Sequence, residues 1–199
     1  TVYGRLNLTA ERQKTDAGTK NEIVNNSSRI GFKGTEDLGG GLQAQFLVEH
    51  GFDASTGKAD STFWGRESWV GLNSSKLGQI KLGNMAASEA YFATADYISN
   101  HNHDTGTSSD ALYDFLATGK LSNAIGYASP KLGDLKLEAQ YGLKKGSGIG
   151  TSDGNSVNPV ALAANYGAGP LQLGLGYESA QNPTTTAAVS ASQVTARVF

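Results

Sequence analysis

Hydrophobic and polar residues alternate along several short segments, the pattern of β-strands with one apolar and one polar face. The clearest pair of segments spans 27–49, where apolar Ile30 and Phe32 alternate with Arg29 and Lys33. A Gly-rich stretch at 36–41 (EDLGGG) follows, and glycine tolerates the positive φ angles of a tight reversal. The pattern therefore predicts a β-hairpin over 27–49 with one apolar and one charged face.

The same alternation predicts further strands along the chain. They are expected at 1–11, 63–72, 79–84, 123–127, 135–143, 160–166, 171–177 and 193–198. Short turns near 38, 75, 132 and 168 alternate with long polar loops near 19, 57, 85–122, 149 and 183; residues 13–25 are expected to be an exposed loop. Four tyrosines lie on apolar faces near strand ends, as in an interfacial aromatic girdle: Tyr127, Tyr141, Tyr166 and Tyr177. These regularities are typical of an antiparallel transmembrane β-barrel.

Composition agrees with strands rather than helices as membrane spans. Of 199 residues 38% are hydrophobic, and no apolar run approaches the roughly 20 residues that a spanning helix needs. The net charge of −2 gives no support for nucleic-acid binding, and the lack of cysteine excludes disulfides and thiolate metal sites. Because alternation begins at Thr1, we expect a mature chain without a signal peptide.

Candidate functional residues come from the wet strand faces and from the long segment 85–122. Four bases alternate with the apolar residues of the early strands, which puts them on the polar, inward face: Arg5, Arg29, Lys33 and Lys81. The face on which Arg66 lies is ambiguous. The segment 85–122 is long for a connection, is rich in acids and has short apolar pieces at 90–95 and 111–117 that suggest helical turns. Its acids could face the bases across a pore and set up a transverse field; the candidates are Glu89, Asp96, Asp110 and Asp114. Alternatively, the bases only solvate the wall or pair with Glu11, Glu49 and Glu67.

No motif indicates catalysis, a metal or a cofactor. His101, His103 and Asp104 lie together, but two histidines fall short of a firm zinc site. The glycines at 39–41 lack the Lys-Ser/Thr of a phosphate-binding loop, and no G-x-S-x-G element is present.

Three blocks of the chain closely resemble the general trimeric porins of Gram-negative outer membranes. They are TVYGRLN at the start, SRIGFKGTEDLGGGLQAQFLVE in the hairpin and GRESWVGLNSSKLGQIKLGN after it. The resemblance implies a single barrel domain of sixteen strands, an inward-folding constriction loop that would correspond to 85–122, and a homotrimer. In that family, arginines on these early strands line the constriction, and the position of Arg66 is often basic.

About ten strands are recognisable before the sequence stops, and members of the family are considerably longer. The apolar face of the last strand is formed by alternate residues, Val194, Ala196 and Val198. Phe199 would therefore lie on the opposite face and point into the lumen. We therefore expect the chain to lack roughly the last third of the barrel, and a full-length intact mass of 20.7 kDa would contradict this.

The sequence thus predicts an outer-membrane porin for passive diffusion of ions and small hydrophilic solutes, in contact with outer-membrane lipid and without enzymatic activity or cofactor. One alternative is an outer-membrane barrel enzyme, a protease or lipid hydrolase, which needs carboxylates and histidine at the extracellular rim. Another is a soluble β-sandwich that binds a ligand, which solubility without detergent would reveal.

Overall fold

The computed structural model of the chain describes residues 1–85, 89–94, 121–143, 158–181 and 190–198. These ranges form thirteen β-strands and one short helix, α1 (Glu89–Thr94), and none of their helices is long and apolar enough to cross a membrane. The strands are β1 (Val2–Arg5), β2 (Leu8–Thr15), β3 (Gly18–Asn25), β4 (Arg29–Gly39), β5 (Leu42–Asp53), β6 (Lys58–Ala59), β7 (Glu67–Ser74), β8 (Gly78–Met85), β9 (Leu121–Ala128), β10 (Leu135–Gly142), β11 (Val160–Ala168), β12 (Leu171–Gln181) and β13 (Ser190–Val198).

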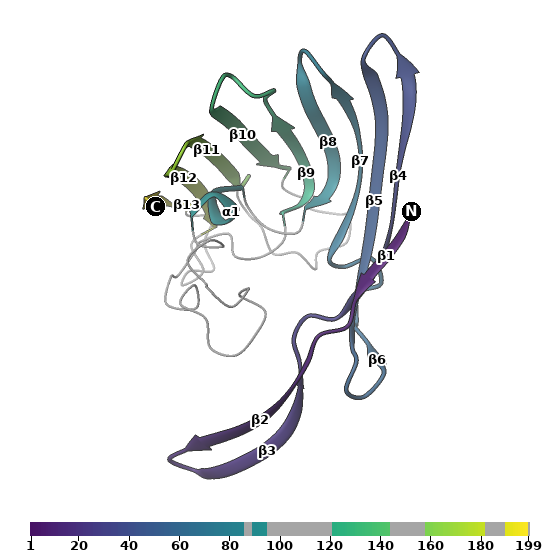
Figure 1. The fold of residues 1–199 in the computed structure, drawn as a ribbon, viewed down its shortest axis with the longest axis vertical. Coiled ribbons are helices and arrows are strands. Elements are labelled where there is room, and N and C mark those ends of the chain that lie inside the picture. The colour runs from purple at the N-terminus through teal and green to yellow at the C-terminus, as the bar shows by residue number, and fades with distance from the viewer. Residues whose placement is uncertain (86–88, 95–120, 144–157, 182–189, 199) are drawn as a thin grey trace.

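Ten strands form one continuous antiparallel sheet. Their order is β1-β4-β5-β7-β8-β9-β10-β11-β12-β13, and β6 pairs with the C-terminal end of β5. Figure 1 shows this sheet curling around a hollow side, with α1 inside the curve. Among the described strands β1 and β13 are the two edges, so the sheet is a curved wall that does not close. The expected all-β, antiparallel barrel architecture is confirmed to this extent.

Four short turns lie together at one end of the sheet, as the alternation of turns and loops predicted. They join β4 to β5, β7 to β8, β9 to β10 and β11 to β12 (Figure 1). In the first turn Gly39, Gly40 and Gly41 have φ angles of +84°, +63° and +80°. A side chain at these positions would be strained in the left-handed region, which explains the glycine run.

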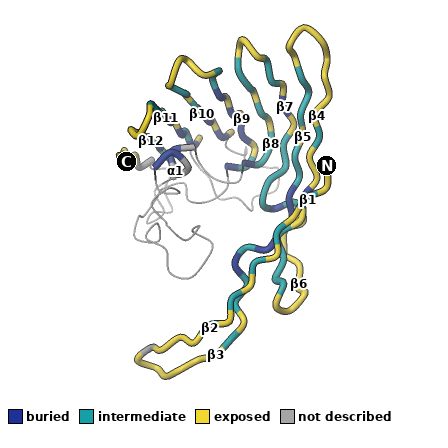
Figure 2. Tube along the Cα trace, in the orientation of Figure 1, coloured by how far each residue is buried: buried dark blue, intermediate teal, exposed yellow. Residues whose placement is uncertain are grey.

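The two faces of the sheet differ in polarity. Outward side chains are apolar and exposed, for example Val70 at 62%, Leu175 at 53% and Val194 at 69%. On the inner face, the side of the sheet against which α1 packs, polar side chains such as Gln140 and Glu178 are buried. Figure 2 shows buried positions along β9 to β12, at α1 and where the ribbon leaves the sheet. A sheet with an exposed apolar outer face and a polar inner face is typical of a barrel wall that contacts lipid outside and water inside.

Residues 13–25 do not form the loop that the sequence predicted. They belong to a separate two-stranded ribbon, in which β2 pairs with β3 from Leu8 opposite Asn25 to Thr15 opposite Gly18. Figure 1 shows this ribbon leaving the sheet. Both of its faces are largely exposed, so its strands need no apolar side, and residues 13–25 carry no apolar alternation.

The chain leaves the sheet after β1, so the strand expected over 1–11 is two strands. The backbone N–H of Asn7 donates to the Ser28 hydroxyl at 3.0 Å, and that of Asn26 donates to the Asn7 carbonyl at 2.9 Å. Ser27, just before β4, has a φ of +57°. These contacts fix the bend between the sheet and the ribbon.

The strand expected at 63–72 is β7, which begins later, at Glu67. Residues 62–65 form a turn instead, with the Gly65 N–H donating to the Thr62 carbonyl at 3.1 Å. The apolar Phe63 and Trp64 pack with their rings 4.7 Å apart, outside the ladder. Their hydrophobicity reflects this aromatic contact rather than strand pairing.

Candidate functional site

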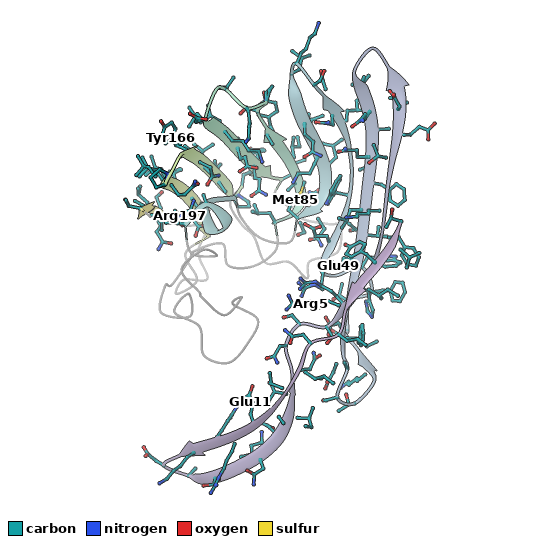
Figure 3. The ribbon with its side chains drawn as sticks, viewed as in Figure 1. Arg5, Glu11, Glu49, Met85, Tyr166 and Arg197 are labelled. Carbon is teal, nitrogen blue, oxygen red and sulfur yellow. The ribbon has the colours of Figure 1, made fainter. Side chains whose placement is uncertain are left out.

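Three arginines meet on the inner face where the ribbon leaves the sheet. Arg5 lies opposite Arg29 in the register of β1 and β4. Arg66 directly precedes β7, and its backbone N–H donates to the Glu49 carbonyl at 3.2 Å. Nη2 of Arg5 donates to the Asn26 carbonyl at 3.3 Å. Figure 3 shows Arg5 and Glu49 at this junction, and the register therefore gathers these guanidinium groups in one place.

Glu49 is the shared partner of the arginines. Its side chain is buried, and Nε of Arg66 donates to its Oε1 at 2.6 Å. Its Oε2 lies 3.7 Å from Nε of Arg29 and accepts a hydrogen bond of 2.9 Å from the Tyr3 hydroxyl. A buried carboxylate needs such partners, because desolvation disfavours its charge. Glu49 therefore holds Arg29 and Arg66 on the wall and neutralises part of their charge.

A second carboxylate, Glu67, lies opposite Glu49 in the register of β5 and β7. Together with the three arginines, these two acids form what we call the charged cluster, with a formal excess of one positive charge. Glu11, another partner that the sequence suggested for the bases, instead accepts hydrogen bonds of 2.6 Å from Thr9 and 2.7 Å from Gln13 within the ribbon. The inner wall is thus a mixed surface in this region rather than a purely basic one.

The two lysine candidates lie farther along the strands and contact aromatic rings. Nζ of Lys33 is 5.1 Å from the centroid of the Tyr3 ring, and Nζ of Lys81 is 5.5 Å from that of Trp69. Trp69 packs against the buried cluster around Met85. Ammonium groups over aromatic faces are held by cation–π attraction, which keeps both charges on the inner side.

The acidic candidates are placed only in part. Glu89 is the first residue of α1. Asp96, Asp110 and Asp114 lie outside the described residues, as do His101, His103, Asp104 and the apolar piece at 111–117. Within the described ranges, no group of three or more His, Cys, Asp and Glu residues could hold a metal ion.

Helix α1 packs on the inner face of β11, β12 and β13, far along the sheet from β8, which precedes it in sequence (Figure 1). Its Ala90, Ala93 and Thr94 are almost completely buried. The Thr94 hydroxyl donates to the Ala90 carbonyl at 2.7 Å and lies 2.9 Å from the Thr195 hydroxyl of β13. The chain after β8 therefore reaches across the concave side of the sheet, and the helical turns expected near 90–95 are confirmed.

Two glycines of β12 permit this close approach, and the sequence analysis missed their role. A Cβ atom on Gly174 would lie 2.1 Å from the Ala93 carbonyl oxygen, and one on Gly176 would lie 2.9 Å from the Ala90 Cβ. Glycine inside a strand often marks such a contact with another backbone. The signal in the sequence was the pair of glycines at alternate, inward positions of a strand whose outward positions are leucines.

Comparison with known proteins places this wall in a family. A family profile described as Gram-negative porin matches residues 1–198. The chain belongs to the Gram-negative porin family. Porins of this family lie in the outer membrane of Gram-negative bacteria, and so does this chain.

Curated porins support the assignment along most of the chain. An outer membrane porin protein of Bordetella pertussis is 28% identical over 169 residues, which cover 78% of this chain and 42% of that protein. The outer membrane porin protein 32 of Delftia acidovorans is 30% identical over 161 residues, covering 75% of this chain and 44% of that porin. The chain therefore spans less than half the length of these relatives.

Solved porins share the fold. An anion-selective porin from Comamonas acidovorans superposes with a TM-score of 0.75 at 24% identity, covering 100% of this chain and 62% of that porin. OmpT of Vibrio cholerae, in a trimer form, gives a TM-score of 0.61 at 16% identity and covers 98% of this chain and 56% of its own. At such low identity these porins support the strand architecture alone.

Proposed function

We propose that this chain contributes consecutive strands to a water-filled outer-membrane channel for passive diffusion of ions and small hydrophilic solutes. The observation that carries the proposal is the polarity of single strands. On β12, outward Leu173 and Leu175 alternate with inward Gly174, Gly176 and Glu178. Strands of this kind separate lipid from water, and membership in the porin family favours a channel over the barrel-enzyme alternative.

A constriction between the inner wall and the segment after β8 is part of this proposal. The basic side consists of the three arginines of the charged cluster and two lysines. These residues are Arg5, Arg29, Arg66, Lys33 and Lys81. The docking of α1 against β11 to β13 supports the proposal, because a chain that leaves β8 and reaches these strands runs across the pore. Glu89, Asp96, Asp110 and Asp114 are the acids proposed to face the bases. Opposed charges at a waist create a transverse field that orients dipolar solutes.

A homotrimer surrounded by outer-membrane lipid is the proposed assembly. OmpT of Vibrio cholerae, which shares the fold, is described in a trimer form. The exposed apolar residues on the outside of β1, β4 and β5, such as Val2, Ile30 and Phe46, would contact either lipid or a neighbouring subunit.

Planar lipid bilayers test the channel directly. The protein, purified from outer membranes in detergent, is expected to insert as stable conductance steps, and as three coupled closing levels if it is trimeric. Its reversal potential in a salt gradient measures ion selectivity. A preparation that is folded by circular dichroism but never conducts would refute the proposed function.

A further inference from the structure

A shallow cavity of about 550 Å³ lies on the inner face across β4, β5 and β7. Its inward-facing lining includes Lys33, Thr35, Gln45, Leu47 and Trp69. In the register of the sheet, Lys33 lies opposite Leu47, and Leu47 lies opposite Trp69. Three successive strands thus place an ammonium group, an aliphatic side chain and an indole in one row.

The apolar part of this row is unusual for a water-facing wall. Leu47 and Trp69 are both half-buried, and Trp69 is backed by the buried cluster of Met85, Leu121 and Ala124. The indole is therefore held in place by packing and offers a preformed surface on the inner side. A flat apolar ring can stack on such a surface without ordering the protein first.

Two cations flank that surface. Nζ of Lys81 lies 5.5 Å from the centroid of the Trp69 ring, and Lys33 is two strands away from Trp69, about 10 Å at the usual strand spacing. Both ammonium groups contact rings through cation–π attraction, and Lys33, which lines the cavity, carries N–H groups that can donate to an anion. The polar neighbour Gln45 already accepts a hydrogen bond of 2.6 Å from Gln79.

We propose that this cavity is a binding subsite for small aromatic carboxylates in transit through the channel. The ring stacks on Trp69 and Leu47, the carboxylate accepts a charge-assisted hydrogen bond from Lys33, and Lys81 adds positive charge beside the indole. Two ammonium groups disfavour aromatic cations, and small inorganic anions gain nothing from the indole. The subsite rests on the proposed function, because a solute must enter the channel to reach the inner face.

Equilibrium binding tests the subsite without requiring conduction. The chain has two tryptophans, and Trp64 lies away from the cavity, with its ring 5.9 Å from that of Phe32. Within this chain Trp64→Phe leaves Trp69 as the single tryptophan, and a Trp64→Phe/Trp69→Phe protein in detergent gives the background fluorescence to subtract. The quenching probe 4-nitrobenzoate should quench Trp69 fluorescence saturably, neutral 4-nitrobenzyl alcohol should quench it only linearly, and benzoate should displace the probe where equimolar acetate does not.

Charge variants give the decisive comparison. Lys33→Gln with Lys81→Gln in the Trp64→Phe background should weaken 4-nitrobenzoate binding about tenfold or more, since charge-assisted hydrogen bonds are lost. Lys136→Gln is the matched control, because it removes an ammonium group from the inner face of β10, where it pairs with Glu138 outside the cavity. This control should bind as the parent does.

Several results would overturn the subsite. They are equal quenching by the acid and the alcohol, equal binding by the double variant and the Lys136→Gln control, and displacement of the probe by a neutral sugar such as maltose, which would indicate a saccharide site. Failure of the channel itself is distinguishable, because a protein that conducts but does not bind contradicts only the subsite. A protein that binds but never conducts contradicts only the proposed function.

Discussion

Replacing Glu49 with glutamine removes one negative charge from the charged cluster and hardly changes the size of the side chain. In the parent, Nε of Arg66 donates to Oε1 of Glu49 at 2.6 Å, and the glutamine carbonyl can still accept this hydrogen bond. Arg29 and Arg66 lose their neutralising partner, so the formal excess of the cluster rises from one positive charge to two. We expect the channel to become more selective for anions.

The size of this effect follows from Coulomb's law. An ion passing roughly 7 Å from the carboxylate interacts with it by about 0.6 kcal/mol at the dielectric constant of water. Screening at about 0.1 M salt, with a Debye length of about 10 Å, reduces this to about 0.3 kcal/mol. Removal of the charge acts with opposite sign on cations and anions, so their difference changes by about 0.6 kcal/mol, or about threefold in the permeability ratio.

Reversal potentials in a tenfold salt gradient across a planar bilayer measure the permeability ratio. Glu22→Gln is the matched control, since Glu22 pairs with Lys20 on the ribbon, away from the sheet. Circular dichroism and thermal melting show whether either variant is misfolded. The predicted shift is contradicted if folded Glu49→Gln has the reversal potential of the parent and of the control, or if its selectivity moves toward cations. The shift should also shrink as the salt concentration rises.

Three further predictions concern the wall itself. Gly174→Ala should destabilise the protein by about 1–3 kcal/mol and change single-channel conductance, because the new Cβ would meet the Ala93 carbonyl oxygen at 2.1 Å. Gly167→Ala is its control, since that Cβ would meet only the movable end of the Gln172 side chain; equal effects of the two would contradict the docking of α1. Leu175→Arg, on the exposed outward face, should destabilise the protein folded in lipid vesicles by about 2–4 kcal/mol if it lies near the bilayer midplane. Asn165→Arg, which points inward, should not cause this destabilisation. Shortening the β2–β3 ribbon to a tight turn should leave the sheet folded, because the ribbon forms a separate two-stranded sheet; loss of the heat-stable fold on electrophoresis would argue against this.

Much of the wall was predictable because the side-chain direction in a strand depends only on near neighbours. Successive side chains point to opposite faces, so alternation at Ile30 and Phe32 was enough to find β4 and to identify its outward side. The glycine run at 39–41 likewise identified its turn, since few other residues accept those φ angles. Alternation failed for residues 13–25 of the β2–β3 ribbon, where both faces of the strands are exposed and no apolar period is present.

The sequence predicted the candidate site only as a set of basic residues on the inward face of the strands. Their partners depend on which strands become neighbours and in what register. Glu49 meets Arg29 because β4 pairs with β5, and it meets Arg66 because β7 follows on the other side of β5. A register shifted by one residue would turn these side chains to the opposite face of the sheet.

The sequence alone therefore determined most strands of the main sheet, their two faces and their short turns, because these follow from interactions within a few residues. Only the tertiary structure decided that Trp69 lies between two lysines and that α1 rests on Gly174 and Gly176. These contacts join residues far apart in the chain, and they exist because the whole sheet curves back on its own concave side.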